Sequence, residues 1–440
     1  MEVLLLGPIF IPLLGAAAGV LLARNRTLQH GLGLIAGILA AACSIGVLAA
    51  NLNGTILTYQ LGGWAPPYGI VLVADLLASM FAVMATVIVA LGILYALGCK
   101  DKCVTYPAFM PLFLCMGAGL SGALYTGDFF TLFVFIELMV ISSVALVAIS
   151  DNRLGLEAAI KYLFISAMGT LFLLIGIAAL YATFGTLNMA QIGSLLATGE
   201  RPLLAPAAAV MLMCAFLLKS AVFPFHFWQP DFHTTAPTPV GALLSSVVVK
   251  VGIYGIIRML TLIFIDEAPL IQNLLIVLGV IGIFFGSLGA LRTYDGKRML
   301  AYSTFGQIGF ILVGIGWGTA ASLAGALVYA FNHSFIKSGL LMLTGVVSSR
   351  TLTKTARLTE IGGVGKSMVL AGGLYFVGGL ALAGVPPLNG FVSKIALLQS
   401  GIGAGSYVVV LLIVSVGIIT LLYMTRTWQH VFQRAPEGEV

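Results

Sequence analysis

Charge is what this sequence has least of. Only 8% of its 440 residues are Asp, Glu, Lys or Arg, against roughly 25% in soluble domains. Hydrophobic residues make up 60%, and the mean hydropathy is +1.11. This composition excludes a soluble protein and indicates a bundle of membrane helices. The apolar runs are continuous rather than alternating, which excludes a membrane barrel built from strands.

Cysteines and cofactor motifs are also scarce. The five cysteines are scattered and odd in number, so they form neither a disulfide framework nor a zinc pattern. Cys99 and Cys103 are most simply two reduced thiols in a loop. No phosphate-binding loop, haem-attachment motif, iron–sulfur cysteine set or Ser–His–Asp signature occurs. We therefore expect no cofactor and no metal, and any redox chemistry would belong to a partner. Whether the chain is part of an enzyme stays open.

The apolar segments predict an all-α polytopic membrane protein with about thirteen spans. The N-terminal stretch carries an acid where a signal peptide carries bases, so we expect it to remain as the first span. The predicted spans are residues 3–22, 31–50, 70–97, 108–125, 128–149, 156–184, 205–222, 238–264, 270–291, 300–316, 321–347, 368–400 and 404–425.

Basic residues in the loops predict the orientation. With the N-terminus outside, Arg201 is the one loop cation that falls clearly outside, and fourteen others face the cytoplasm. The positive-inside rule therefore places the C-terminal end of this chain in the cytoplasm. The net charge of +6 follows from this topology and implies no nucleic-acid partner. The cytoplasmic set is Arg24, Arg26, Lys100, Lys102, Arg153, Arg292, Lys297, Arg298, Arg350, Lys354, Arg357, Lys366, Arg426 and Arg434.

Proline clusters interrupt the seventh and twelfth spans, at residues 223–232 and 383–391. If spans four to eight and nine to thirteen form two five-helix repeats, each break falls in the fourth helix of its repeat, and the repeats are inverted. Paired broken helices of this kind point to a transport site near the bilayer midplane, although two unrelated proline kinks are the alternative. The predicted organisation is a three-helix segment at 1–107, repeats at 108–264 and 270–425, and a cytoplasmic tail at 426–440.

Several ionisable residues lie too deep in the spans to reach the surface easily. Each buried charge costs at least about 2.5–3.5 kcal/mol, so we interpret the set as functional, with charge-paired packing as the alternative. Burial disfavours the charged form of a lysine and a nearby carboxylate favours it. At about 4 Å and an effective dielectric near 20, that attraction is on the order of 4 kcal/mol. The predicted proton-transfer residues are Glu137, Lys219, Lys250, His333, Lys337 and Lys394.

Two further groups would serve the same path. Ser245, Tyr302, Ser303 and Gln307 are available to hold connecting waters. His226, Asp231 and His233, in the segment after the seventh span, could collect protons at the cytoplasmic mouth. Metal binding is the alternative for these last three, but nothing else converges there.

These residues resemble a known family, the antiporter-like membrane subunits shared by respiratory complex I, Mrp-type Na⁺/H⁺ antiporters and membrane-bound hydrogenases. The most specific stretch is LLKSAVFPFHFWQPDFHTTAPTPVGALLSSVVVKVGIYGIIR, residues 217–258. Four others agree: FIELMV at Glu137, RTYDGKRMLAYSTFGQIGF from Arg292, HSFIKSGLLMLTG with His333 and Lys337, and GVPPLNGFVSK ending at Lys394.

The resemblance implies fourteen helices with two inverted five-helix repeats, and a proton path through the glutamate–lysine pair, central lysines or histidines and a lysine of the twelfth helix. A fourteenth helix does not follow the thirteenth predicted span, either because it is absent or because the sequence is a fragment. Lys394 and Ser245 favour the Mrp D-type, and Lys394 also fits the complex I N-type.

Three functions follow, in this order. The first is a proton-translocating subunit of an Mrp-type antiporter in the cell (inner) membrane, with other membrane subunits, protons and possibly Na⁺ as partners. The second is a membrane subunit of a complex I-type NADH:quinone oxidoreductase or a hydrogenase. The third is a structural scaffold whose buried charges merely pair.

Overall fold

The computed structural model describes residues 2–199, 202–350 and 356–434. Predicted loop charges Arg201 and Lys354, and residues 435–440 of the predicted tail, lie outside the described residues. The chain divides into two compact units: unit 1 lies within 1–98, 102–220 and 247–267, and unit 2 within 99–101, 221–246 and 268–440.

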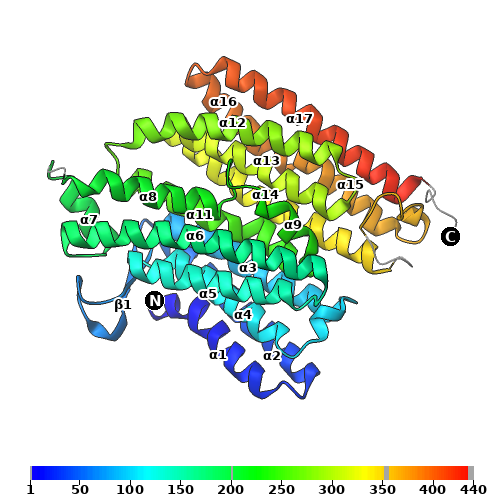
Figure 1. Ribbon diagram of the computed structural model, residues 1–440, viewed down its shortest axis with the longest axis horizontal. Coiled ribbons are helices and arrows are strands. Elements are labelled where there is room, and N and C mark those ends of the chain that lie inside the picture. The colour runs from blue at the N-terminus through cyan, green and yellow to red at the C-terminus, as the bar shows by residue number, and fades with distance from the viewer. Residues whose placement is uncertain (1, 200–201, 351–355, 435–440) are drawn as a thin grey trace. The chain divides into compact units, whose positions relative to one another are not determined.

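Unit 1 is a helical bundle with one two-stranded hairpin (Figure 1). Strands β1 and β2 pair antiparallel, with Leu57 opposite Ala74. Helix α6 packs against both α5 and α8, and α11 packs against α8. The elements are η1 (Glu2–Leu6), α1 (Gly7–Leu21), α2 (Arg26–Asn51), β1 (Leu57–Gln60), η2 (Leu61–Gly63), β2 (Val71–Ala74), α3 (Leu76–Gly98), η3 (Lys102–Thr105), α4 (Phe109–Tyr125), α5 (Phe129–Ala148), α6 (Arg153–Phe184), α7 (Met189–Leu196), α8 (Leu204–Lys219), α11 (Val249–Arg258) and η5 (Met259–Ile263).

Unit 2 is also built from packed helices, with α13 in contact with both α12 and α14, and α14 in contact with α15 and α16 (Figure 1). A π-helix, η4 (Leu244–Val248), follows α10 in the chain and leads to α11. The elements are α9 (Trp228–Thr235), α10 (Thr238–Leu243), α12 (Ala268–Arg292), α13 (Gly296–Gly316), α14 (Ala320–Arg350), η6 (Val364–Lys366), α15 (Val369–Ala383), α16 (Asn389–Gly403), α17 (Tyr407–Trp428) and η7 (Gln429–Gln433).

Short polar side chains start several of these helices. Asn25, Asp128, Asn152, Asn188 and Asp295 each accept a hydrogen bond from a backbone N–H three residues further on, at the start of α2, α5, α6, α7 and α13. These bonds satisfy donors that the first helical turn leaves without partners. The starts of these five helices are therefore encoded by single Asn or Asp residues.

Glycines allow α12 and α13 to approach closely. A Cβ atom on Gly286 would clash with the backbone nitrogen of Gly306, and one on Gly309 would lie 2.5 Å from the carbonyl oxygen of Gly279. Small residues at helix contacts let backbones pack tightly in membrane proteins, where the hydrophobic effect between helices is absent. Gly286 and Gly309 thus act as packing residues at the α12–α13 contact.

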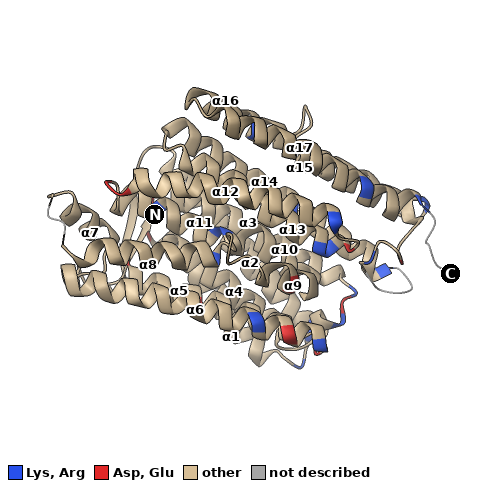
Figure 2. Cartoon of the chain, turned by 45° about the horizontal axis from the view of Figure 1, so that its top comes forward, with Lys and Arg blue, Asp and Glu red and all other residues tan. Residues whose placement is uncertain are grey.

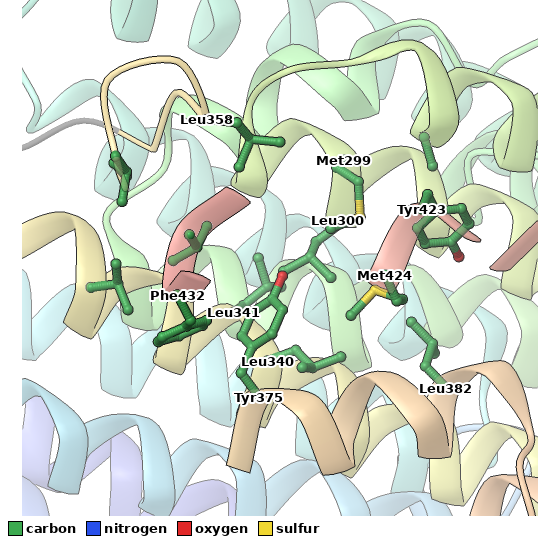
Figure 3. Packing of buried hydrophobic residues seen from close by; sticks show 14 of the residues in the cluster. Met299, Leu300, Leu340, Leu341, Leu358, Tyr375, Leu382, Tyr423, Met424 and Phe432 are labelled. Carbon is green, nitrogen blue, oxygen red and sulfur yellow. The ribbon is translucent and has the colours of Figure 1, made fainter. Parts of the chain in front are cut away.

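The buried core of unit 2 joins residues of several helices, among them α13, α14, α15 and α17 (Figure 3). Met299 and Leu300 of α13, Leu340 of α14 and Tyr375 of α15 are each no more than 3% exposed, and Tyr423 of α17 is fully buried. This apolar cluster holds α13 and α14, which carry several of the predicted site residues, in a fixed relation.

Nine helices among the described residues are long and apolar enough to cross a membrane, and three shorter apolar helices accompany them. Figure 2 shows that most of the helical surface carries no charge and that Lys, Arg, Asp and Glu gather mainly near helix ends and in loops. The helical membrane fold predicted from composition is confirmed. The total of thirteen spans stays a prediction.

One predicted span starts differently. The sequence predicts a helix throughout the segment 70–97, but Val71–Ala74 form strand β2 and the helix begins at Leu76. Residues 71–73 are β-branched or bulky and pair with β1, while the Asp75 carboxylate accepts the N–H of Ala78 at 2.8 Å and so starts α3.

Both predicted helix breaks are present. Helix α8 ends at Lys219 and the next helix starts at Trp228, while α15 ends at Ala383 and α16 starts at Asn389. Two residues at the breaks have left-handed backbones: Ala221 with φ 53° and Gly384 with φ 85°. The prolines after them cannot continue a helix, because proline lacks the N–H donor and clashes with the preceding turn.

Candidate functional site

Glu137 and Lys219, two of the candidate residues, lie close together inside unit 1. Lys219 is the last residue of α8, and its Nζ lies 3.6 Å from Oε1 of Glu137 on α5. The lysine side chain is 4% exposed and that of the glutamate 25%. A lysine and a glutamate that are distant in the chain thus form an ion pair at the contact of apolar helices.

Two hydroxyls of α6 complete this pair. The Lys219 ammonium donates to Ser166 Oγ at 2.6 Å and to Thr170 Oγ1 at 3.4 Å. The Thr170 hydroxyl in turn donates to the Glu137 carboxylate. Sequence reasoning missed both hydroxyls, although their spacing of four residues places them on one face of a helix. Thr170 is therefore hydrogen-bonded to both members of the pair.

Lys250 lies on α11 and is fully buried. Two residues further on, a Cβ on Gly252 would clash with Ser220 Oγ, beside the end of α8. Glycine at this position lets α11 pack directly on the end of the helix that carries Lys219. Both predicted lysines of unit 1 therefore belong to helices that touch at the break.

A second ion pair in unit 1 was not foreseen as such. The Arg258 guanidinium binds both oxygens of Asp75, at 2.5 and 2.6 Å, and its Nε donates to Tyr254 at 3.0 Å. Tyr254 donates to the carbonyl of Leu124 at 2.7 Å. This network joins the start of α3 to α11 and α4. Asp75 and Arg258 are 183 residues apart, so no local pattern reveals their pairing.

Lys337 and Ser303 form the centre of the predicted site in unit 2. The fully buried Lys337 on α14 donates to Ser303 Oγ at 2.8 Å and to the Leu300 carbonyl at 3.1 Å. Ser303 is also hydrogen-bonded to Tyr423 at 2.8 Å. The structure thus brings Lys337 and Ser303 together as hydrogen-bonded partners and adds Tyr423.

Other hydroxyls and amides surround the same two helices. Tyr329, one turn before His333 on α14, donates its hydroxyl proton to Gln307 of α13. The rings of Tyr329 and His333 are nearly parallel, with centroids 6.4 Å apart. Ser245 is hydrogen-bonded to Thr304. Gln307 and Ser245 therefore form side-chain hydrogen bonds, and His333 makes a ring contact, at or beside the α13–α14 pair.

Lys394 spans the second helix break. Its Nζ donates to the carbonyl of Ala383, the last residue of α15, at 2.7 Å and lies 5.2 Å from the Phe310 ring centre. A Cβ on Gly384 would lie 2.6 Å from Cδ of Lys394. Gly384 is therefore required twice, for its left-handed backbone and for the space that the lysine fills.

A small cavity joins His333 to Lys394. Its volume is about 10 Å³, which is close to the space that one water needs. Asn332 and Ser393 also line it. Asn332 donates to Ser393 Oγ at 2.6 Å. The two predicted proton-transfer residues thus face one water-sized space between α14 and α16.

The residues expected at the cytoplasmic mouth have different surroundings. Asp231 forms an ion pair with Arg298 at 3.0 Å. His226 stacks on Phe305, with ring centres 4.6 Å apart. His233 is 1% exposed. Arg298 also lies over the ring of Tyr302, with its Cζ 6.0 Å from the ring centre.

A bundle of apolar helices that holds ionisable groups in its interior defines a class: polytopic α-helical membrane proteins with ionisable residues inside the bundle. Within that class, residues 126–420, more than half of the chain, match the family described as NADH:quinone oxidoreductase/Mrp antiporter, TM. The chain belongs to this family and is a multi-pass membrane protein.

Subunits of antiporters and of NADH-quinone oxidoreductases both align with nearly the whole chain. The D-type subunit of an Na⁺/H⁺ antiporter from Alkalihalophilus pseudofirmus is 32% identical over 98% of this chain and 87% of its own length. The N-type subunit of an NADH-quinone oxidoreductase from Desulforudis audaxviator is 34% identical over 96% of this chain and 85% of its own length. A solved chain from the Mrp complex of Dietzia sp. superposes with a TM-score of 0.91 at 28% identity, covering 99% of this chain and 80% of that one.

Proposed function

We propose that this chain is a proton-translocating subunit of a multisubunit membrane complex, acting like the D-type subunit of an Mrp-type cation/proton antiporter. The observation that carries the proposal is the pair of the buried Lys219 with the partly buried Glu137, bridged by the Thr170 hydroxyl. Burial opposes the charged lysine and the carboxylate favours it. A change in the distance between the two groups therefore makes the lysine bind or release a proton.

The remaining buried groups extend the path. We propose that protons pass from the Glu137–Lys219 pair to Lys250, then to the His333 and Lys337 group, and leave through Lys394. Hydroxyl contacts to Lys337 and the water-sized cavity between His333 and Lys394 support this order, because hydroxyls and waters conduct protons between fixed donors. His226, Asp231, His233, Ser245, Tyr302, Ser303 and Gln307 are proposed as the secondary path.

Membrane, orientation and partners follow from the loop charges and the relatives. We propose the cell (inner) membrane, with the N-terminus outside and the C-terminal end of this chain in the cytoplasm. Other membrane subunits are its partners, since the named relatives are themselves subunits. The inverted repeats at 108–264 and 270–425 are likewise proposed, each with one of the two helix breaks.

A second candidate function is a proton-pumping membrane subunit of a complex I-type NADH:quinone oxidoreductase. The observation in its favour is the 34% identity to an N-type subunit of that enzyme. In that setting the chain would carry no redox centre, and electron transfer in partner subunits would drive the same buried groups.

Proton uptake into everted vesicles that contain the complete set of subunits tests the proposal. We expect Lys219→Ala to abolish uptake at equal expression and assembly. The chain offers a matched control, because Lys161 and Glu157 on α6 form an ion pair at 2.6 Å with side chains about half exposed. Lys161→Ala should leave uptake unchanged. Normal uptake in Lys219→Ala would reject the proposal.

The same vesicles separate the two candidates. Proton uptake that occurs only when Na⁺ leaves the vesicles in exchange identifies an antiporter. Uptake that requires NADH and quinone, and is indifferent to Na⁺, identifies the redox-driven complex.

A further inference from the structure

A groove opens at the junction of α12 and α13 in unit 2. Its volume is about 520 Å³, and the residues that line it include Phe285, Leu288, Arg292, Arg298 and Tyr302. It lies away from the hydrogen bonds of Lys337 and Lys394, which are made inside the unit. The proton path proposed above uses only Tyr302 of these five residues.

The groove has an apolar half and a cationic half. Phe285, Leu288 and Arg292 are spaced by three and four residues on α12, so they form one stripe along that helix. Phe285 and Leu288 are 47% and 53% exposed, so a large part of each side chain is open to an apolar ligand. Arg292 is the last residue of α12. The stripe is therefore apolar along the helix and cationic at its end, as a phospholipid has an apolar acyl chain that ends in a charged headgroup.

Two arginines contribute the charge. Arg292 is exposed, and the Arg298 side chain is 42% exposed although it pairs with Asp231 at 3.0 Å. The carbonyls of Leu291 and Thr293, at the negative end of α12, each accept a hydrogen bond from Arg426. That arginine offsets the negative end of α12, which would otherwise repel an anion.

The remaining charged groups near the groove have other contacts. Lys297 reaches the Ala236 carbonyl at 3.5 Å, and the Asp295 carboxylate accepts the N–H of Arg298 as the cap of α13. Asp231 is therefore the carboxylate that an incoming anion would displace from the Arg298 side chain.

We propose that this groove binds one anionic phospholipid. Its phosphate lies between Arg292 and Arg298, and an acyl chain lies along Phe285 and Leu288. Arginine pairs bind phosphate through charge-assisted, bidentate hydrogen bonds, and basic pockets between membrane helices are suited to acidic headgroups. A free phosphate ion would use only the cationic half, whereas the exposed apolar stripe matches a lipid.

Binding has a direct effect on Asp231. A phosphate that takes over Arg298 frees the Asp231 carboxylate, which lies in the segment after the first helix break. The lipid and Asp231 compete for one guanidinium, so removing the carboxylate strengthens lipid binding.

Native mass spectrometry of the purified full chain tests this. The protein is offered equimolar phosphatidylglycerol and phosphatidylcholine, and the ratio of the two bound lipids is measured. We expect a preference for phosphatidylglycerol that falls about thirtyfold in the double variant R292Q/R298Q. Arg153→Gln, which removes an exposed arginine from unit 1, is the matched control and should keep the preference.

Two more arms keep the test decisive. Asp231→Asn should raise retention of phosphatidylglycerol, a gain that a misfolded protein cannot produce. Excess inorganic phosphate should not displace the lipid. An unchanged ratio in the double variant, no gain in Asp231→Asn, or displacement by phosphate would each overturn the proposal. None of these readouts depends on proton transport.

Discussion

Each unit has a lysine at a helix break, and the two lysines are stabilised in different ways. Lys219 is the last residue before its break and contacts a carboxylate and two hydroxyls on neighbouring helices. Lys394 follows its break and reaches back to the Ala383 carbonyl. Among the described residues, no carboxylate lies within salt-bridge distance of Lys394.

The two lysines differ in whether their partner can move relative to them. Glu137 belongs to another helix than Lys219, so a shift of α5 relative to α8 changes their attraction. The Ala383 carbonyl is backbone at the negative end of α15, which favours a cation without any partner side chain. We infer that Lys219 responds to helix movement, while Lys394 responds to the shape of its own break.

The largest effect is expected when the carboxylate partner of Lys219 is removed. Glu137→Gln should abolish proton uptake, because the neutral amide no longer favours the protonated lysine. Removing one member of a buried pair also costs about 3–5 kcal/mol, so assembly of the complex is checked by native gel. Glu157→Gln, in the exposed pair on α6, should transport normally. Equal transport by both variants would contradict the role of the pair.

Lys394→Ala tests the second half. We expect uptake close to background, measured in the same vesicles, because the proposed exit then lacks its proton-binding group. Uptake by Lys394→Ala at the wild-type rate, with the complex assembled as in wild type, would show that the proton path does not need Lys394.

Ser166→Ala should have an intermediate effect. A hydrogen bond to a charged group contributes about 1.5–3 kcal/mol, so we expect uptake to slow by about tenfold while the ion pair persists. Ser415 on α17, whose hydroxyl is exposed and bonds to its own helix at 2.7 Å, provides the control Ser415→Ala. A Ser166→Ala variant as fast as this control would remove Ser166 from the site.

The smallest expected effect concerns the second break. Gly384→Ala forces a Cβ into a left-handed backbone and against the Lys394 side chain. The backbone strain alone is about 1–2 kcal/mol, so the thermal unfolding midpoint of the purified protein should fall by a few degrees. Gly373→Ala, on the same α15 with open space around it, should not lower it. A midpoint unchanged by Gly384→Ala would mean that Lys394 is not held as described.

The sequence alone was sufficient to predict features that are energetically unfavourable within a single segment, such as a charge or a proline inside an apolar helix. Glu137, Lys219, Lys337 and Lys394 stand out as ionisable residues within apolar segments, and the prolines mark both breaks. The helical fold and these candidate residues followed from the sequence, but the contact between Glu137 and Lys219 did not.

Other features depend on contacts between distant segments. Ser166 and Thr170 resemble any hydroxyl residues of an apolar helix until α5 and α8 pack beside them. The Asp75–Arg258 pair joins residues 183 positions apart, and strand β2 needs its partner β1 to form. These could not be predicted, because their energy comes from tertiary packing rather than from local pattern.

The most direct measurement is proton uptake by Lys219→Arg, compared with Lys219→Ala, in everted vesicles with the complete complex. Arginine keeps a positive charge beside Glu137 but cannot release a proton. If Lys219 binds and releases the transported proton, both variants fail, although the arginine variant assembles normally. Transport by Lys219→Arg at the wild-type rate would show that the pair only holds the helices together, and would contradict the proposed mechanism.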